Sequence, residues 1–526
     1  MRLLAAIRGR GPRRSYRHSG WLFLRLLGLV HLVAFVSLWV QLEGLVGAGG
    51  ILPVGEFLER VHGRFGSESY GLLPTLSWIS HSDAFLDGLC AVGAALSLLL
   101  LCDVAPIPVL ALLWACYLSL QISGQTFLGF QWDILLLETG FTALFLAPGR
   151  IRPRLPWNEA DPPRAGRWLV WLLLFKLMFL SGAVKLVCLD ETWWGLTALD
   201  YHYFTQPLPL ATSWYAHQLP AWFQRLSVLV MFAIELGAPL LIFGPRRLRH
   251  AACGALLFLQ LAIAATGNYG FFNLLTAVLC LPLVDDDLAE RLLPRRLRRR
   301  GGAAVAGTRR WLRWTGSGAR ATGAAAIALL SALTFVREIV RTEPPQGIDG
   351  PVGAALDAAD RYVLSWGNTA LGWIDPYNTV SGYGLFRAMT TARPEIVIEV
   401  SQDGRAWREL EFRWKPGDVR RRPALVAPHM PRLDWQMWFA ALNPQRSYPW
   451  LERLLARLLE GAPAVEALLG EKPFASGPPR FVRLVAYDYE FTSAEERART
   501  GAWWRRTRRG ELTRALSRET FAARPN

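Results

Sequence analysis

Cysteine is scarce in this sequence, and its six residues are poorly placed for disulfide or zinc chemistry. All six lie in or beside apolar segments, none is spaced as Cys-x-x-Cys, and none follows residue 280. The C-terminal part must therefore fold without disulfides in any compartment. The eight histidines lack His-Glu-x-x-His spacing, and no glycine-rich phosphate loop opens a helix. We therefore expect no metal site and no nucleotide site.

Lysine is scarce as well, because arginine supplies nearly all of the positive charge and lysine occurs only at positions 176, 185, 415 and 472. The net charge is +16, but the arginines gather in short blocks between apolar runs. This distribution is typical of loops that set membrane orientation and not of a nucleic-acid surface. We expect no nucleic acid among the partners.

Apolar residues make up 52% of the 526 residues, and the mean hydropathy of +0.21 indicates a membrane protein. The first apolar run, 21–40, contains Arg25 and is not followed by a small-residue cleavage site, so it predicts a retained span rather than a signal peptide. About nine spans are predicted, at 21–40, 84–101, 104–123, 126–147, 168–187, 225–243, 251–266, 269–284 and 322–340.

The arginine content of the loops predicts the orientation. Arginine-rich segments (1–20, 148–167, 244–250 and 291–320) alternate with segments that are poor in arginine and lysine (41–83, 121–126, 188–224 and 267–270). The positive-inside rule then places the N-terminus in the cytoplasm and the C-terminal part outside or in a lumen. The expected location is the inner membrane in a bacterium or the endoplasmic reticulum membrane in a eukaryote. The 291–320 stretch could instead bind anionic headgroups of membrane lipid.

After residue 342 the apolar blocks give way to short alternating runs. Segments 395–400 and 407–414, joined by an Asp-Gly turn, predict a β-hairpin; 481–491 predicts a strand, and 431–442 and 449–459 predict helices. We therefore predict a basic cytoplasmic N-terminus (1–20), a multi-span α-helical membrane domain (21–341) and an external soluble domain (342–526). The soluble domain is expected to be α+β or β-sandwich-like. Its aromatic residues Trp435, Trp438 and Phe439 either form its core, the more common role, or contact lipid or a client protein.

Polar side chains inside predicted spans are costly and usually face a partner or a cavity. This chain has seven that we single out: Arg25, Gln131, Asp133, Glu138, Lys176, Lys185 and Glu235. The acidic groups of 126–147 could pair with Arg25 or Lys185 across the bundle. The cluster either forms buried ion pairs that fix helix register or lines a binding or catalytic cavity. A desolvated lysine can lose its proton whereas arginine cannot, which singles out the lysines as possible bases.

The predicted external loop 188–224 is rich in aromatic and polar side chains, among them Asp200, His202, Tyr203 and His217. Anchoring by tryptophan and tyrosine at the membrane interface is the ordinary explanation for such a loop. The alternative is a lid over a cavity that contains Lys185.

Long stretches of the chain resemble the lipase maturation factor family. They include FQWDILLLETGF at 130–141, KLMFLSGAVKL at 176–186, TGNYGFFNLLT at 266–276 and PHMPRLDWQMWFAAL at 428–442. The resemblance implies a multi-pass membrane protein, in animals of the endoplasmic reticulum, that helps secreted dimeric lipases fold and assemble. It also implies that the soluble domain contacts the secreted client protein, for which a lipase is the first candidate.

A second resemblance is confined to the membrane part. LSGAVKLVCLDETWWG at 180–195 is similar to a stretch of the vitamin K-dependent γ-glutamyl carboxylases and their related transmembrane domain. That resemblance implies a catalytic base at Lys185, although only one lysine of the paired-lysine pattern is kept and extra residues precede Trp193.

Two interpretations follow for the function. The preferred one is a membrane-embedded maturation or folding factor for exported proteins that performs no covalent chemistry and needs no cofactor. The alternative is a carboxylase-like membrane enzyme with Lys185 as base, in an outward-facing cavity ringed by Asp133, Glu138 and His202. Only the alternative implies a quinone-like cofactor.

Overall fold

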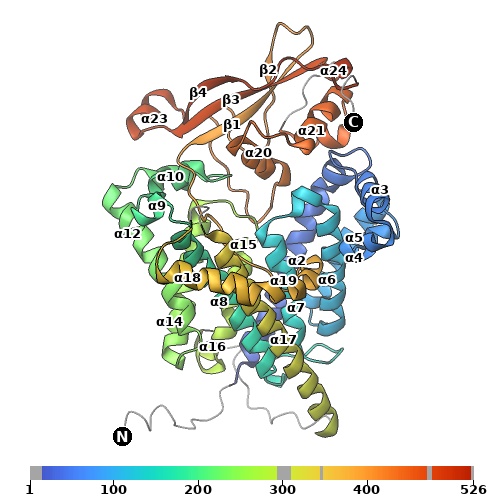
Figure 1. The fold of residues 1–526 in the computed structure, drawn as a ribbon, viewed down its shortest axis with the longest axis vertical. Helices are drawn as coiled ribbons and strands as arrows, with labels where there is room; N and C mark the ends of the chain where they lie inside the picture. The colour runs from blue at the N-terminus through green and yellow to red at the C-terminus, as the bar shows by residue number, and fades with distance from the viewer. Residues whose placement is uncertain (1–14, 293–309, 344–346, 471–476, 523–526) are drawn as a thin grey trace.

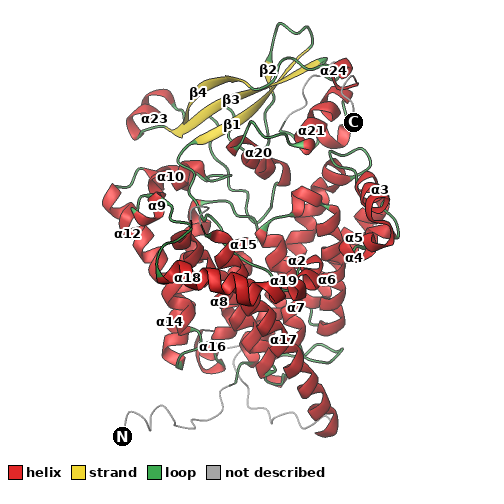
Figure 2. Ribbon diagram, in the orientation of Figure 1, coloured by secondary structure: helices red, strands yellow, loops and turns green. Residues whose placement is uncertain are grey.

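The computed structural model describes residues 15–292, 310–343, 347–470 and 477–522. Most of the two basic segments predicted at 1–20 and 291–320 therefore lies outside the described residues. Figure 1 shows a bundle of long helices with the C-terminal region seated on one end of it, and Figure 2 shows that the strands are confined to that region.

Seven helical segments of the described chain are long and apolar enough to cross a membrane. They are α2 (Arg17–Val46), α5 (Asp83–Leu101), α6 (Pro106–Ser123), α8 (Arg164–Val187), α12 to α13 (Ala221–Leu241, through the π-turn η5), α14 (Arg246–Thr266) and the apolar part of α17 (Arg310–Thr342). Leucine and alanine dominate these segments, and both residues favour helix strongly. Local signals set two of the starts: Ser82 accepts a hydrogen bond from Phe85 N–H at the start of α5, and Pro106 opens α6.

Helices occupy all nine predicted span positions in the described chain, but two of them are shorter than a bilayer requires. They are α7 (Gln131–Leu146) and α15 (Phe272–Cys280), which the turn η6 (Leu281–Leu283) extends. Most of their side chains are buried between the longer helices. Seven of the nine predicted spans therefore have the length of a bilayer crossing. The other two are short interior helices, which are enclosed by protein and need no lipid-facing length.

The loops separate by charge to the two ends of the bundle. At one end, here called the basic end, the start of α2 contacts the loop after α7, where Trp21 Nε1 donates to Arg154 O at 2.8 Å. The same turn contacts α16 (Asp286–Leu292), where Asp286 accepts a hydrogen bond from His18 N–H. The opposite, distal end carries α3 (Val54–Phe65), α4 (Ser69–Leu72), α9 (Glu191–Trp194), α10 (Ala198–Thr205) and α11 (Ala211–His217). Segment 188–220 at that end contains no arginine or lysine.

The C-terminal region contains one four-stranded antiparallel sheet in the order β2-β1-β3-β4. Its strands are β1 (Arg393–Ser401), β2 (Arg408–Glu409), β3 (Phe481–Phe491) and β4 (Trp504–Glu511). The helices of this region are α20 (Arg432–Leu442), α21 (Pro449–Glu460), α22 (Pro463–Glu466), α23 (Ala494–Thr500) and α24 (Arg518–Ala522). Helix α20 lies against β1, and α21 buries one leucine-rich face. This arrangement is the α+β alternative, since the described strands form a single sheet.

The predicted hairpin is present, but its second strand is shorter than the sequence suggests. Asp403 accepts hydrogen bonds from the N–H groups of Arg405 and Ala406 and closes the turn, in which Gly404 has a φ of 72°. Strand β2 then spans two residues, because the chain leaves β1 and Asp434 of α20 binds the N–H groups of Trp414 and Lys415. Strand β4, which the sequence did not predict, supplies the other edge.

The chain between α17 and the sheet does not leave the bundle. It forms α18 (Pro351–Ala358), the π-helix η8 (Ala359–Leu364) and α19 (Ser365–Ile374), and η8 and α19 pack on α17. Residues 378–390 then run between the membrane helices before β1 begins.

Candidate functional site

One buried polar cluster joins α7, α8 and the 378–390 segment. Lys176 Nζ lies 2.5 Å from Glu138 Oε1, and both side chains are almost fully buried. The second carboxylate oxygen of Glu138 accepts hydrogen bonds from Tyr383 OH at 2.5 Å and from the backbone N–H of Ser381 at 3.1 Å. Gln131, about two turns earlier on α7, accepts a hydrogen bond from Gly384 N–H at 3.4 Å. The carboxylate is therefore satisfied on both oxygens, and it fixes the segment that leads into the sheet.

The second carboxylate of α7 binds the C-terminal region directly. Both carboxylate oxygens of Asp133 contact the guanidinium of Arg432, on α20, with 2.7 Å from Nη2 to Oδ1. Tyr117 OH of α6 donates to the same Oδ1 at 2.6 Å. The side chains of Asp133 and Arg432 are both 0% exposed, so the pair is fully desolvated. A bidentate arginine pair of this kind fixes orientation as well as distance.

Lys185 pairs with Glu235 inside the bundle. Its Nζ lies 2.8 Å from Glu235 Oε2 and donates a second hydrogen bond to Ser181 O, one turn earlier on α8, also at 2.8 Å. Glu235 sits on the π-turn η5, where the wider helix turn presents it toward α8. The lysine also lies over the ring of Trp193. Neither Asp133 nor Glu138 contacts Lys185, because each has another cation.

Arg25 forms its ion pair at the basic end. Its guanidinium contacts Asp103, which also binds Arg150 at 2.5 Å, and Arg150 in turn contacts Glu159. The predicted pairing of the α7 carboxylates with Arg25 or Lys185 is therefore wrong. The physical reason is position: Asp133 and Glu138 lie in the distal part of the bundle, whereas Arg25 lies two turns from the start of α2 at the other end.

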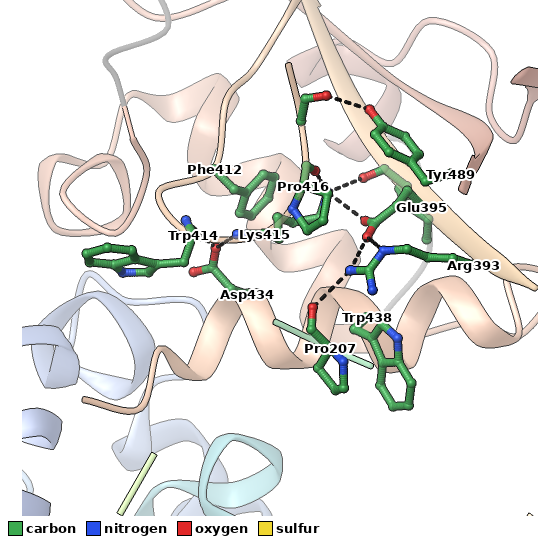
Figure 3. A network of polar contacts seen from close by, with 12 residues as sticks. Pro207, Arg393, Glu395, Phe412, Trp414, Lys415, Pro416, Asp434, Trp438 and Tyr489 are labelled. Carbon is green, nitrogen blue, oxygen red and sulfur yellow. Dashed lines mark hydrogen bonds and ion pairs between the residues drawn. The ribbon is translucent and has the colours of Figure 1, made fainter. Parts of the chain in front are cut away.

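The third described lysine belongs to the C-terminal region (Figure 3). Lys415 Nζ lies 2.8 Å from Glu395 Oε2, and the other oxygen of Glu395 accepts from Arg393 Nε at 2.9 Å. Arg393 also donates to the backbone oxygens of Phe204, Gln206 and Pro207 in the 188–220 loop. All three described lysines are thus buried and paired with a glutamate. The sequence analysis singled out Lys176 and Lys185 because lysine is scarce. The same argument applied to Lys415, and the sequence analysis did not make it there.

The predicted external-loop residues surround this contact. His202 Nε2 lies 3.1 Å from Tyr269 OH, which donates to Gln206 at 2.9 Å. Burial, with the nearby Lys185 ammonium, lowers the pKa of His202 to about 4. Tyr203 is buried, Asp200 is half-buried, and His217 packs between the rings of Phe204 and Phe491. Part of the loop thus packs against β3 and the residue that follows it, where Trp214 Nε1 donates to Thr492 O at 3.0 Å.

The aromatic residues of α20 face this loop and α7. Trp435 packs on Phe130 and Trp132, and Trp438 Nε1 donates to Thr205 O at 2.8 Å. Both tryptophans are buried, which is the core role, and they are not available to a client in this conformation. Phe439 is 40% exposed and is the one of the three that presents a surface.

A set of neutral contacts that the sequence did not indicate completes the junction. Ser37 Oγ of α2 lies 2.9 Å from His429 Nδ1 and accepts from Met430 N–H at 2.9 Å. Gln41, one turn later, donates to Met430 O and accepts from Arg432 N–H. Serine and glutamine inside an apolar helix were visible in the sequence as unexplained polar residues, but their partners lie almost 400 positions away.

The two histidines at this junction predict acid sensitivity. Burial, followed by Arg432 and Arg413, lowers the pKa of His429 to about 4, as burial does for His202. Below pH 6.5 the unfolded chain binds protons that the folded chain does not, so stability is full above pH 6.5 and falls toward pH 4. Each histidine contributes at most about 1.4 kcal/mol per pH unit.

Thermal unfolding of the purified protein between pH 7.5 and 4.5 measures this slope. We expect His429→Gln and His202→Gln each to flatten it, whatever their effect at neutral pH. An unchanged slope in both variants would show that other groups cause the acid sensitivity.

The comparisons with known proteins match both parts of this structure. Residues 18–291 match the lipase maturation factor transmembrane domain, and residues 379–514 match the lipase maturation factor C-terminal domain. The chain belongs to the lipase maturation factor family. It is 38% identical to lipase maturation factor 2 of Gallus gallus over 95% of this chain and 80% of the relative, and 39% identical to that of Homo sapiens over 92% and 80%. It is 33% identical to lipase maturation factor 1 of Homo sapiens over 97% and 91%. No solved structure matches.

For this member of the lipase maturation factor family, the site is therefore a junction between the two matched domains. The protein is an integral, multi-pass membrane protein, and its buried ion pairs join the transmembrane domain to the C-terminal domain. Residues 292–378, which carry α17 to α19, lie between the two matched segments.

Proposed function

We propose that this protein is a membrane-embedded maturation factor for exported proteins, that its clients are secreted lipases, and that the C-terminal region contacts the client. The observation that carries the proposal is the seating of that region on the distal end by Arg432 and Asp133, Glu138 and Tyr383, and Arg393. The ion pairs support a rigid platform that holds one protein surface at the membrane.

In the proposed orientation the basic end faces the cytoplasm and the C-terminal region faces the outside or the lumen. The support is the alternation of loops. The arginine-rich loops 148–167 and 244–250 both contact the start of α2 at the basic end, through Arg154 and Arg249, and 188–220 at the distal end has no arginine or lysine. A secreted client would then meet the C-terminal region in the compartment where it folds. That compartment is the endoplasmic reticulum in a eukaryote and the space outside the inner membrane in a bacterium.

The direct test uses cells that lack their own family member and secrete a dimeric lipase. The measurement is the ratio of secreted lipase activity to secreted lipase protein, with and without this protein. We expect the ratio to rise when the protein is supplied. A panel of lipases whose ratios all stay unchanged, at normal membrane levels of the protein, would overturn the proposal.

Lys185 separates this function from the carboxylase-like alternative. Its pair with Glu235 supports a structural charge, and arginine keeps that charge whereas it cannot act as a base at neutral pH. We therefore expect Lys185→Arg to restore most of the lipase ratio and Lys185→Ala to lose most of it, scored at matched membrane levels.

The matched control is Lys176→Arg. Lys176 is also a buried lysine paired with a glutamate, but the carboxylase-like alternative does not assign it the role of base. Failure of Lys185→Arg alone, in a protein that folds and reaches the membrane, would favour the enzyme with Lys185 as base. A search for a quinone-like cofactor would then follow.

A further inference from the structure

A cleft of about 620 Å³ opens at the basic end of the bundle, between the start of α14 and α16. Figure 1 shows α16 and one end of α14 at the same end of the bundle. The described residues that line the cleft are Pro245, Arg246, Arg247, His250, Leu288 and Arg291. Three of these six are arginines and none is a carboxylate. The lining therefore offers positive charge and hydrogen-bond donors, which suit an anion.

The arginine at the centre of the lining is held in position by acidic residues at the start of α16. The Arg246 guanidinium contacts Asp285 through Nε at 2.6 Å and through Nη2 at 2.9 Å, and Asp287 through Nη1 at 3.3 Å. This contact joins segments 39 positions apart and brings exposed Arg247 and Arg291 to one cleft. The positive-inside rule requires only that arginines lie on one side of the membrane, so it does not account for this convergence.

The turn that carries the cleft fixes its level in the membrane. Residues 242–245 alone separate the spans Ala221–Leu241 and Arg246–Thr266, so the turn lies where both helices leave the hydrocarbon. Trp168 of α8, 50% exposed, stacks on Phe243 of this turn with ring planes 16° apart. Tryptophan is enriched at the boundary between headgroups and acyl chains. The cleft therefore lies at the level of the headgroups.

The surroundings of the cleft favour a lipid over a soluble anion. Leu240 and Leu248, close to the turn on the two spans, are 58% and 45% exposed. Acyl chains can pack on these side chains, whereas a soluble anion gains nothing from them. Helix α14 begins here with Pro245 as its N-cap and without a side-chain cap. The positive end of a 21-residue helix thus adds to the charge of the arginines.

We propose that this cleft binds the phosphate of an anionic phospholipid headgroup, with Arg246, Arg247 and Arg291 around the phosphate. The acyl chains then run along Leu240 and Leu248. Guanidinium groups match the geometry of phosphate oxygens, and basic pockets between membrane helices bind anionic headgroups in other proteins. A free phosphate would meet the same arginines without the apolar contacts. A lipid seated here ties the turn between two spans to α16.

Native mass spectrometry of the full-length protein, released from detergent micelles, tests the proposal because it resolves each bound lipid. The protein is titrated separately with phosphatidylglycerol, phosphatidylcholine and sn-glycerol 3-phosphate, which is a soluble phosphate without acyl chains. A volatile salt at about 0.15 M limits the Debye length to about 8 Å and screens long-range attraction. The measured quantity is the dissociation constant of the first molecule bound.

We expect the unmodified protein to bind phosphatidylglycerol more tightly than phosphatidylcholine, and sn-glycerol 3-phosphate most weakly. Replacing Arg247 and Arg291 together by glutamine should weaken the binding of phosphatidylglycerol at least about tenfold, because each arginine near a headgroup contributes about fivefold. Binding of phosphatidylcholine should stay within about twofold, since it carries no net charge. If the double variant does not fold, Arg247→Gln alone should weaken phosphatidylglycerol binding about fivefold.

The matched control replaces Arg152 and Arg154 by glutamine. Both are exposed at the same end of the bundle, do not line the cleft and carry the same charge. Equal weakening in the control and the cleft variant would overturn the proposal, because surface charge in general would then attract the lipid. Unchanged binding in the cleft variant would overturn it too. Binding of sn-glycerol 3-phosphate as tight as that of phosphatidylglycerol, lost in the cleft variant, would replace the lipid by a soluble phosphate.

Discussion

Replacing Arg432 by alanine is expected to detach the C-terminal region from the bundle. The substitution leaves the Asp133 carboxylate buried at 0% exposure, with Tyr117 OH as its remaining side-chain donor. Removal of one partner from a fully buried pair costs about 3–5 kcal/mol. The neutral contacts of Ser37 and Gln41 are already made in the unmodified protein, so they do not compensate for that loss.

The measurement is protease sensitivity of the C-terminal region in membranes, together with thermal unfolding of the purified protein. The control is Arg505→Ala, which breaks an exposed pair with Glu490 of about the same length. Its side chains are 56% and 57% exposed, so we expect less than about 1 kcal/mol. Equal effects of the two alanine substitutions would contradict a special role for the buried pair.

A double variant tests whether the charge pair itself is required. Replacing Asp133 by leucine and Arg432 by methionine together removes both charges and keeps apolar volume, which is often neutral for stability. We expect the double variant to be more stable than either single one. If the double variant folds but no longer raises the lipase activity ratio, the Asp133–Arg432 pair sets the orientation of the C-terminal region and does not only stabilise the protein.

The second large effect is expected at Lys176. Lys176→Ala removes the only cation beside Glu138 among the described residues and leaves that carboxylate 2% exposed. We expect a loss of about 3–5 kcal/mol, and a low level of the protein in membranes. Tyr383→Phe removes one hydrogen bond to the same carboxylate and should cost about 1.5–3 kcal/mol.

Tyr448→Phe is the matched control for the tyrosine variant, because Tyr448 OH makes only a 3.5 Å contact to Phe439 O at an exposed position. The order of effects, Lys176→Ala above Tyr383→Phe above Tyr448→Phe, is the result to check by thermal unfolding. Rescue of Lys176→Ala by Glu138→Gln would support the charge explanation. A Tyr383→Phe protein as stable as the unmodified one would show that the 378–390 segment is held by other contacts.

The helices could be read from local patterns. Runs of leucine and alanine place α2, α5, α6, α8 and α14 close to their predicted positions, since hydropathy and helix propensity act within one segment. The strand at 481–491 and the helix at 449 were also predicted, because alternation and amphipathic spacing are local signals. The length of α7 was not, because burial by neighbouring helices, and not its own composition, allows a shorter helix.

The sequence by itself determined that the chain is a polytopic membrane protein, that its basic loops alternate, and that its few buried lysines and carboxylates need partners. Only the tertiary structure decided which partners they have. Asp133 binds Arg432, nearly 300 positions away, and Glu138 binds Lys176 and Tyr383. The need for a counter-charge is a property of one side chain in a low dielectric, whereas its choice depends on which helices pack together, and packing is not written in any single segment.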